Sequence, residues 1–165
     1  MRIPLKPEDT KPPAPAGYYP IKIAALRVDT ITGFDIFLAI TDVEAPVLFS
    51  DRNLPVTLSK LDRLRETGHA QIYVSSTQEK DYHRYIEEHL ENILTDESLP
   101  VPARAEVLYE SAQYHLQEVF SSPRSGELVA RSKSIVRSSC EFLIKQRSAF
   151  AHILSIISYD YYTYT

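Results

Sequence analysis

The sequence predicts an α+β fold in which a small four-stranded β-rich module with one covering helix is followed by a helical bundle that ends in a long C-terminal helix. Three observations lead to this prediction. Apolar residues alternate over residues 18–75, recur at helical spacing after residue 76, and return every seven positions near the C-terminus. We therefore expect a flexible arm (1–17), an α+β module (18–76) and a helical region (77–165).

Composition and charge exclude several classes of protein. The chain has 165 residues, of which 44% are hydrophobic and 24% charged, as in ordinary soluble domains. Its formal net charge is −4, so nucleic-acid binding, which usually needs a clustered basic face, is disfavoured. No apolar run approaches the roughly 18 to 20 residues of a membrane-spanning helix, and the N-terminus lacks the apolar core of a signal peptide. We expect a cytoplasmic chain without membrane contact.

The cysteine content limits redox chemistry. Cys140 is the single cysteine, which rules out an internal disulfide and a multi-cysteine zinc site and suits a reducing cytosol. We expect it to be a small packing residue, because no histidine or helix N-terminus adjoins it to activate the thiol.

Residues 1–17 are predicted to form a flexible arm. The segment combines charged residues with prolines, which lack a backbone N–H and break helices. A linker is favoured over a polyproline ligand because no tight motif is present. The prolines are Pro4, Pro7, Pro12, Pro13 and Pro15.

Four short strands are predicted in the β-rich module, since β-branched and aromatic residues alternate there. They cover residues 21–23, 34–40, 45–50 and 71–75. The second strand has one apolar face that another element must cover, formed by Phe34, Ile36, Leu38 and Ile40.

The covering element is predicted to be a helix over residues 57–67. Thr57 or Ser59 can cap its N-terminus, and Gly68 stands at its C-terminal end. Its apolar side, at helical spacing, consists of Leu58, Leu61 and Leu64.

Two amphipathic helices follow, one over residues 77–94 and one that begins at Pro102, a residue suited to the first turn of a helix. The apolar side of the first consists of Tyr82, Tyr85, Ile86, His89, Leu90, Ile93 and Leu94. That of the second consists of Ala105, Leu108, Ala112, His115, Leu116 and Val119.

The last third, residues 125–165, is predicted to be one long helix. Its apolar residues occur in adjacent pairs that return every seven positions, as in helices that keep one stripe against a partner. The pairs are Leu128/Val129, Ile135/Val136, Phe142/Leu143, Ala149/Phe150 and Ile156/Ile157.

Polar residues between these pairs leave three arrangements open: packing on its own domain together with a dimer contact, purely intramolecular packing, or a break near Ser138 or Ser148. The intervening polar positions are Ser132, Ser139 and Gln146. We expect a homodimer through this helix, because a helix of this length exceeds what a small domain can cover. The interface residues would be Val129, Val136, Leu143, Phe150 and Ile157.

No catalytic residue, cofactor or metal ligand is predicted. His83 and Glu87 are four residues apart on one predicted helix, which lets two ligands meet one ion, but the sequence supplies no third ligand nearby. His89 and His115 lie on apolar stripes, where buried hydrogen-bonding residues are the favoured interpretation. The four glycines do not cluster into a phosphate-binding loop, and the Gly-x-Ser-x-Gly motif is missing from the sequence.

The chain ends in the tyrosine-rich run Ile156-Ile157-Ser158-Tyr159-Asp160-Tyr161-Tyr162-Thr163-Tyr164-Thr165. This run resembles the segment that leads into the catalytic domain of HD-GYP proteins, the cyclic-di-GMP phosphodiesterases, where a His-Ser metal-ligand sequence comes next. The chain has no His-Asp dipeptide, and Gly17-Tyr18-Tyr19-Pro20 departs from the Gly-Tyr-Pro motif. No catalytic residue of the family can therefore be assigned here.

The resemblance implies a non-catalytic N-terminal regulatory and dimerisation region of a bacterial, HD-GYP-type metal-dependent phosphohydrolase. An HD-type catalytic domain would follow in cis after Thr165, and the last helix would transmit a change of state to it. The alternative, from a different class, is a stand-alone ligand- or protein-binding module, with possible contacts at Tyr82, Tyr85 and Tyr114.

Overall fold

The computed structural model describes four ranges of the chain, with side chains described as far as Ser158: residues 14–40, 44–66, 72–122 and 125–163. Nearly all of the predicted N-terminal arm lies outside these ranges. So do Gly68, the predicted end of the first helix, and the side chains of the C-terminal tyrosines.

The four predicted strands form one antiparallel sheet with the order β1-β4-β2-β3. The α+β class is confirmed. Strand β4, one of the two inner strands, is buried along its first three residues because it has neighbours on both edges. The strands are β1 (Tyr18–Ile21), β2 (Ile36–Leu38), β3 (Val47–Ser50) and β4 (Ile72–Ser75).

The first strand lies earlier in the chain than predicted. Tyr18 pairs with Ser75 and Ile21 with Ile72, whereas Ile23–Ala25 forms a 3₁₀ turn, η1. The turn carries Ala25 into the core, where it is fully buried. Burial of these small and apolar residues thus decides where the strand ends.

The predicted helix in the module is α1 (Leu58–Glu66). The backbone N–H of Lys60 donates to Thr57 Oγ1 at 3.3 Å, so Thr57 is the capping residue of the two considered. Leu61 and Leu64 are buried as predicted, but Leu58 is exposed.

The apolar face predicted for the second strand is only partly buried. Phe34 and Ile36 are buried, but Ile40 is exposed. Leu61 and Leu64 of α1 belong to the same buried core cluster as Phe34 and Ile36. Rings of the next helix, α2 (Glu79–Thr95), also lie on Phe34: Tyr82 and Tyr85 each meet it edge-on with centroids 5.6 Å apart.

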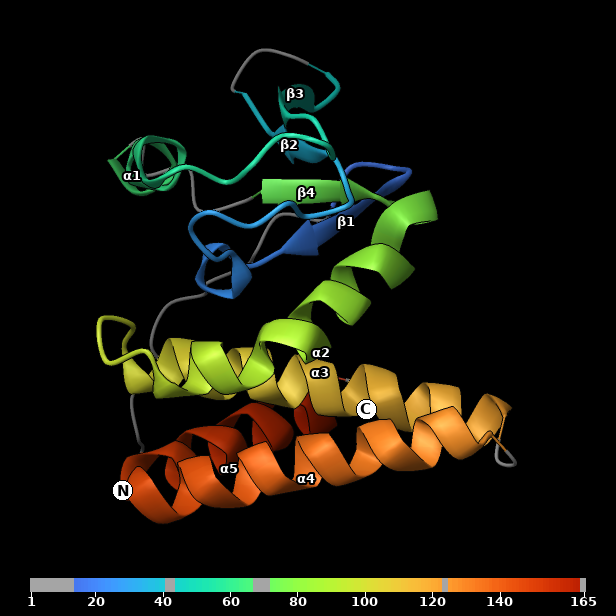
Figure 1. Cartoon of the computed structure of the whole chain (residues 1–165), viewed down its shortest axis with the longest axis vertical. Coiled ribbons are helices and arrows are strands. Elements are labelled where there is room, and N and C mark those ends of the chain that lie inside the picture. The colour runs from blue at the N-terminus through green and yellow to red at the C-terminus, as the bar shows by residue number, and fades with distance from the viewer. Residues whose placement is uncertain (1–13, 41–43, 67–71, 123–124, 164–165) are drawn as a thin grey trace.

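Three further helices complete the described fold: α3 (Val101–Ser121), α4 (Gly126–Lys145) and α5 (Arg147–Thr163). Figure 1 shows α2 running from the sheet into a layer formed with α3, while α4 and α5 lie on the far side of α3 from the sheet. The predicted stripe of α3 is buried at Ala105, Leu108 and His115 but exposed at Leu116. None of the described helices is long and apolar enough to cross a membrane.

The single long helix predicted for residues 125–165 is wrong. The chain leaves the helix at Gln146 and begins α5 at the next residue, close to Ser148, one of the two breaks considered. The N–H of Gln146 still donates to the carbonyl of Phe142 at 2.8 Å, and the N–H of Ala149 donates to Gln146 at 2.9 Å. The break lets α5 turn back against α3 and α4 and buries Ala149 completely. A straight helix would have left that surface in water.

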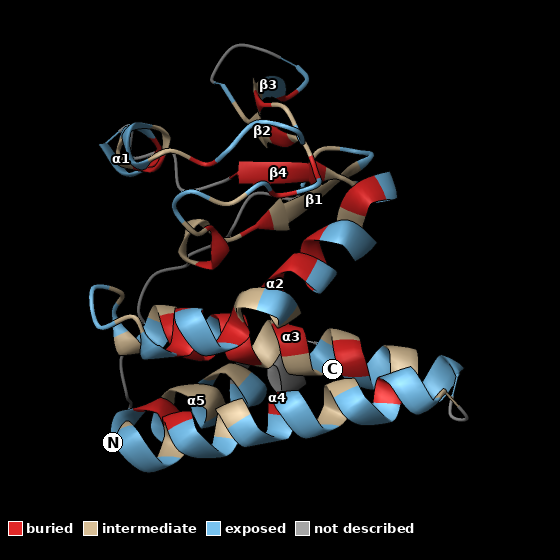
Figure 2. Ribbon diagram, viewed as in Figure 1, coloured by how far each residue is buried: buried red, intermediate tan, exposed pale blue. Residues whose placement is uncertain are grey.

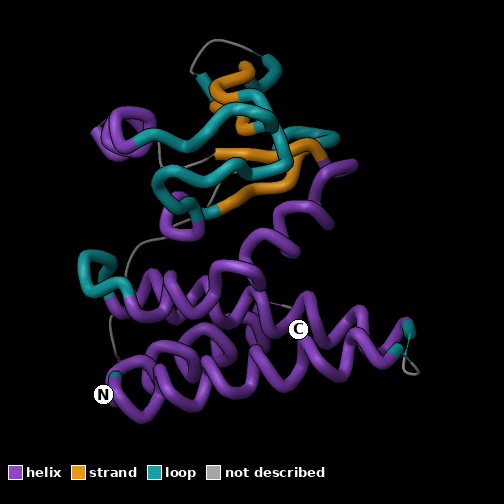
Figure 3. The backbone as a smooth tube through the Cα atoms, viewed as in Figure 1, coloured by secondary structure: helices purple, strands orange, loops and turns teal. Residues whose placement is uncertain are grey.

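The core is one connected cluster that reaches from the sheet through the helices. Figure 2 shows buried residues along α2 and α3, whereas α4 buries one stripe and α5, over its described side chains, buries Ala149 alone. Figure 3 shows the strands gathered at one end of the molecule and the long helices at the other. The division of the chain near residue 76 into two modules stays a prediction.

Candidate functional site

Four of the five residues predicted as an interface are exposed on α4 and α5, and the fifth, Leu143, packs against the core. In two of the three adjacent apolar pairs of α4 the first member is buried and the second is exposed. Ile135 is 7% exposed, and Val136 beside it is 60% exposed. Leu128 is buried and Val129 exposed in the same way, and Leu143 is half-buried. The seven-residue repeat therefore has one covered and one uncovered stripe.

Helix α5 repeats this arrangement. Ala149 is buried and Phe150 is 56% exposed; Ile157 is also exposed, and Leu154 lies between them at helical spacing. Two neighbouring helices thus each carry an uncovered apolar stripe.

Cys140 belongs to the outer stripe of α4. It follows Val136 by four residues and is exposed, so the prediction of a small packing residue is wrong. It lies on the side of α4 turned away from the buried residues Ile135 and Phe142.

A polar cluster joins α2, α3 and α4 on their inner sides. Arg131 of α4 donates from Nε to one Glu87 oxygen at 2.6 Å and from Nη2 to the other at 2.8 Å. The same Nη2 donates to Glu118 of α3 at 2.5 Å. These hydrogen bonds raise the pKa of the Arg131 guanidinium further above its usual range, so it stays charged.

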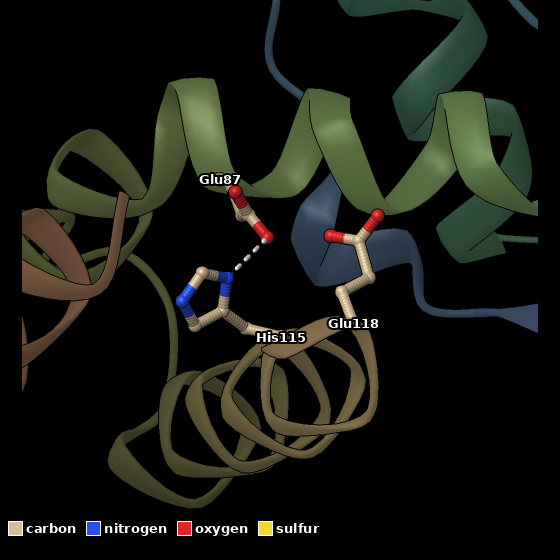
Figure 4. A group of neighbouring side chains, drawn as sticks. All are labelled: Glu87, His115 and Glu118. Carbon is tan, nitrogen blue, oxygen red and sulfur yellow. Dashed lines mark ion pairs between the residues drawn. The ribbon is translucent and has the colours of Figure 1, made fainter. Parts of the chain in front are cut away.

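His115 of α3 is buried beside this cluster. Its Nε2 lies 2.7 Å from Ser132 Oγ, and its Nδ1 lies 3.7 Å from Glu87 Oε1. Figure 4 shows the His115 ring turned toward Glu87, with the Glu118 carboxylate to the right of both. The prediction that His115 is a buried hydrogen-bonding residue is confirmed.

His83 and Glu87, whose spacing was considered for a shared metal ion and not adopted, interact with different residues. His83 is 2% exposed and stacks on Tyr114, with centroids 3.8 Å apart and planes at 12°. Burial lowers its pKa to about 4, so the ring is neutral at pH 7. Glu79 Oε1, 3.9 Å from its Nε2, therefore makes no ion pair with it at that pH. Glu87 pairs across helices with Arg131 and His115 instead.

The other histidine and two of the tyrosines considered in the sequence pack within the protein. His89 is half-buried against Tyr85, with ring centroids 4.5 Å apart. Tyr82 and Tyr85, considered as ligand contacts, are core residues whose hydroxyls accept from the backbone N–H of Lys22 and Arg27. They are therefore not available to a ligand.

Tyr114 differs from the other two tyrosines because it lines a cavity. The space measures about 480 Å³ and lies between α2, α3 and α4. Its wall also includes Lys80, Arg84, Glu118 and Arg131, so it is mainly polar. A second cavity of about 240 Å³ shares Arg84 and Arg131 with it.

Sequence reasoning missed Arg131 and Glu118. A signal was present: Arg131 stands three residues after Leu128 and four before Ile135, on the face that the repeat predicts to be buried. A cation at such a position needs an acidic partner. The sequence does not indicate which of the many glutamates supplies it.

Comparison with known proteins gives a limited result. The sequence matches no family model, and no curated protein matches it. Among solved structures, the chain is similar to Bd1817, described as a HDG"Y"P protein from Bdellovibrio bacteriovorus, with a TM-score of 0.43 and 22% sequence identity. The match covers 84% of this chain and 45% of that one, so this chain spans less than half of that protein's length.

Proposed function

We propose that this chain is a non-catalytic regulatory and dimerisation region of an HD-GYP-type phosphohydrolase. In this proposal two copies associate through the outer stripes of α4 and α5, and the catalytic domain follows in cis. The resemblance of residues 156–165 supports the assignment to this family, and the exposed apolar stripes support the dimer interface.

The observation that carries the dimer proposal is the alternation within the pairs Leu128/Val129 and Ile135/Val136 of α4 and Ala149/Phe150 of α5. A helix that packs only on its own domain carries its apolar residues in one stripe that faces the core. Here Val129 and Val136 keep the seven-residue spacing outside the core. Exposed apolar residues scattered singly are ordinary, but a regular stripe on two adjacent helices is typical of a protein contact.

The route by which a signal would travel differs from the one expected for a straight helix. Because the chain turns at Gln146, α5 is braced against α3 and reaches the sheet only through the helical layer. A shift of α4 against α2 would therefore move α5 and whatever follows it.

The test uses Val136→Glu, which places a charge in the proposed contact without disturbing the core. We expect wild type to sediment as a dimer at tens of micromolar and the variant as a monomer, since burying an unpaired charge at an interface costs about 2 to 5 kcal/mol, or roughly 30-fold to several-thousand-fold in affinity. Ala130→Glu is the matched control, because Ala130 is exposed on the same helix about 100° from the stripe. A monomeric wild type, or equal effects of the two variants, contradicts the proposed interface.

Cys140 offers an independent check. It is the single cysteine and lies on the proposed contact stripe, so mild oxidation of a dimer should trap a disulfide-linked pair that Val136→Glu no longer forms.

The cavity of about 480 Å³ favours a second candidate, a small-molecule or protein-binding module, because it lies between helices and is lined by polar side chains and Tyr114. This function becomes the leading one if the wild-type chain is a monomer.

A further inference from the structure

We propose that Glu87, His115 and Glu118 form a binding site for a divalent transition metal such as Zn²⁺, in which Arg131 holds the cation position until the metal displaces it. Histidine nitrogens and glutamate oxygens both bind zinc, and three protein ligands with a water molecule complete a tetrahedral site. The site is separate from the outer stripes and does not depend on the proposed dimer.

The three ligand groups converge from two helices. One donor atom from each residue lies within 4.8 Å of the other two, and all three side chains project into the space between α2 and α3 (Figure 4). Zinc–ligand bonds of about 2.1 Å place tetrahedral donors roughly 3.4 Å apart. Side-chain rotations that move each donor by about 1 Å close this difference, and water would take the fourth position.

The hydrogen bonds of His115 leave one nitrogen without a partner. Ser132 has a single hydroxyl proton, and it is donated to the carbonyl oxygen of Leu128 at 2.8 Å. Ser132 Oγ must therefore accept from Nε2–H of His115. In the neutral ring this leaves the lone pair on Nδ1.

That lone pair points at an acceptor. Nδ1 is buried with no hydrogen-bond partner among the described residues, and the nearest group is Glu87 Oε1 at 3.7 Å. A lone pair that faces a carboxylate oxygen in a buried place is unfavourable unless a cation lies between them. A metal ion at this point removes the conflict, and the Ser132 contact already orients the ring in the way that outer contacts orient metal-bound histidines.

Arg131 supplies part of the positive charge that a metal ion would bring to this place. It supplies one positive charge to two carboxylates, Glu87 and Glu118, but offers nothing that Nδ1 of His115 can accept from in this geometry. Its side chain lines both cavities beside the cluster, so it can swing into open space when a divalent ion enters. The guanidinium is therefore a competitor, and its removal should tighten metal binding.

The experiment is a titration with Co²⁺, whose visible absorption reports tetrahedral coordination by nitrogen and oxygen. We expect weak binding to wild type, binding at least tenfold tighter to Arg131→Gln, and loss of the visible band in Arg131→Gln/His115→Ala. Arg131→Gln/His152→Ala is the control, because His152 is a histidine of α5 outside the cluster. Binding to Arg131→Gln that is no tighter than wild type, or a band that survives loss of His115, overturns the proposal.

A second measurement covers the case in which Arg131→Gln does not fold. Zn²⁺ should raise the unfolding temperature of the wild-type chain, with Mg²⁺ having no effect because it avoids nitrogen ligands. Glu87→Gln should abolish the Zn²⁺ shift, whereas Glu88→Gln, which changes the adjacent exposed carboxylate, should keep it. A shift that is absent in wild type, or lost equally in both variants, contradicts the site.

Discussion

The two sides of α2 are closed in different ways. Toward the sheet, Tyr82 and Tyr85 pack on Phe34, and both hydroxyls are engaged by backbone N–H groups. Toward α4, the shortest contacts are the charged hydrogen bonds between Glu87 and Arg131. The first contact consists of buried rings, and the second of a cation held by two carboxylates.

This difference separates a fixed part of the molecule from a changeable one. Buried apolar area cannot be exchanged without opening the core. A guanidinium that is held by carboxylates can give way to another cation, since both states satisfy the same charges. We infer that the sheet and α2 stay together while α4 and α5 are the elements able to shift.

The largest expected effect comes from making the same substitution, isoleucine to alanine, in α2 and in α4. Ile86→Ala should lower the free energy of unfolding by about 4 kcal/mol and Ile135→Ala by about 2 kcal/mol, because Ile86 of α2 is 0% exposed in the core, whereas Ile135 lies on the inner face of the outer helix α4 and is 7% exposed. Urea unfolding of the two variants measures this. Equal losses would show that α4 is packed as tightly as the sheet.

The buried histidine predicts a smaller, pH-dependent effect. Burial lowers the pKa of His83 to about 4 in the folded protein, compared with about 6.5 when unfolded. Between these values the unfolded chain binds a proton that the folded chain does not, so stability falls as the pH drops from 6.5 to 4, by roughly 3 kcal/mol in total. Above pH 6.5 this loss of stability is absent, because the ring is neutral in both the folded and the unfolded chain.

His83→Phe keeps the stacking on Tyr114 and removes the titration. We expect its stability, measured by urea unfolding at several pH values, to lose this component of the acid dependence. Parallel curves for the two proteins between pH 4 and 6.5 would contradict a neutral buried ring.

The smallest effect is expected on the outer stripe. Val129→Ser should change the free energy of unfolding by less than about 0.5 kcal/mol in dilute, monomeric samples, because Val129 is exposed. The inner neighbour supplies the contrast: Leu128→Ser should cost several times more. Similar losses would mean that Val129 is covered within one chain.

Much of the local structure was predictable from the sequence. The strands and the apolar faces of α2 and α3 follow from alternation and helical spacing, which depend on near neighbours only. The sequence limited the cap of α1 to Thr57 or Ser59, and the structure selected Thr57. The misplaced first strand and the exposed Ile40 show where this fails, since both depend on how far the sheet extends over the core.

The sequence also predicted one of the two candidate sites and not the other. The pair spacing predicted the stripe of Val129 and Val136, and the structure left it outside the core. The cluster of Glu87, His115 and Arg131 was not predictable, because residues 44 positions apart had to be brought together by packing. His83, four residues before Glu87, is buried against Tyr114 and takes no part in the cluster.

What the sequence determined by itself is the identity and direction of the faces: which side of each helix is apolar, and that the last third carries two apolar residues per repeat. The tertiary structure alone decided that the chain turns at Gln146 and that one arginine joins three helices. The physical reason is the distance along the sequence over which the deciding interactions act. A helical period is set by residues three and four apart, whereas a turn that buries Ala149 and a charge that finds two carboxylates depend on surfaces that exist only after the chain has folded.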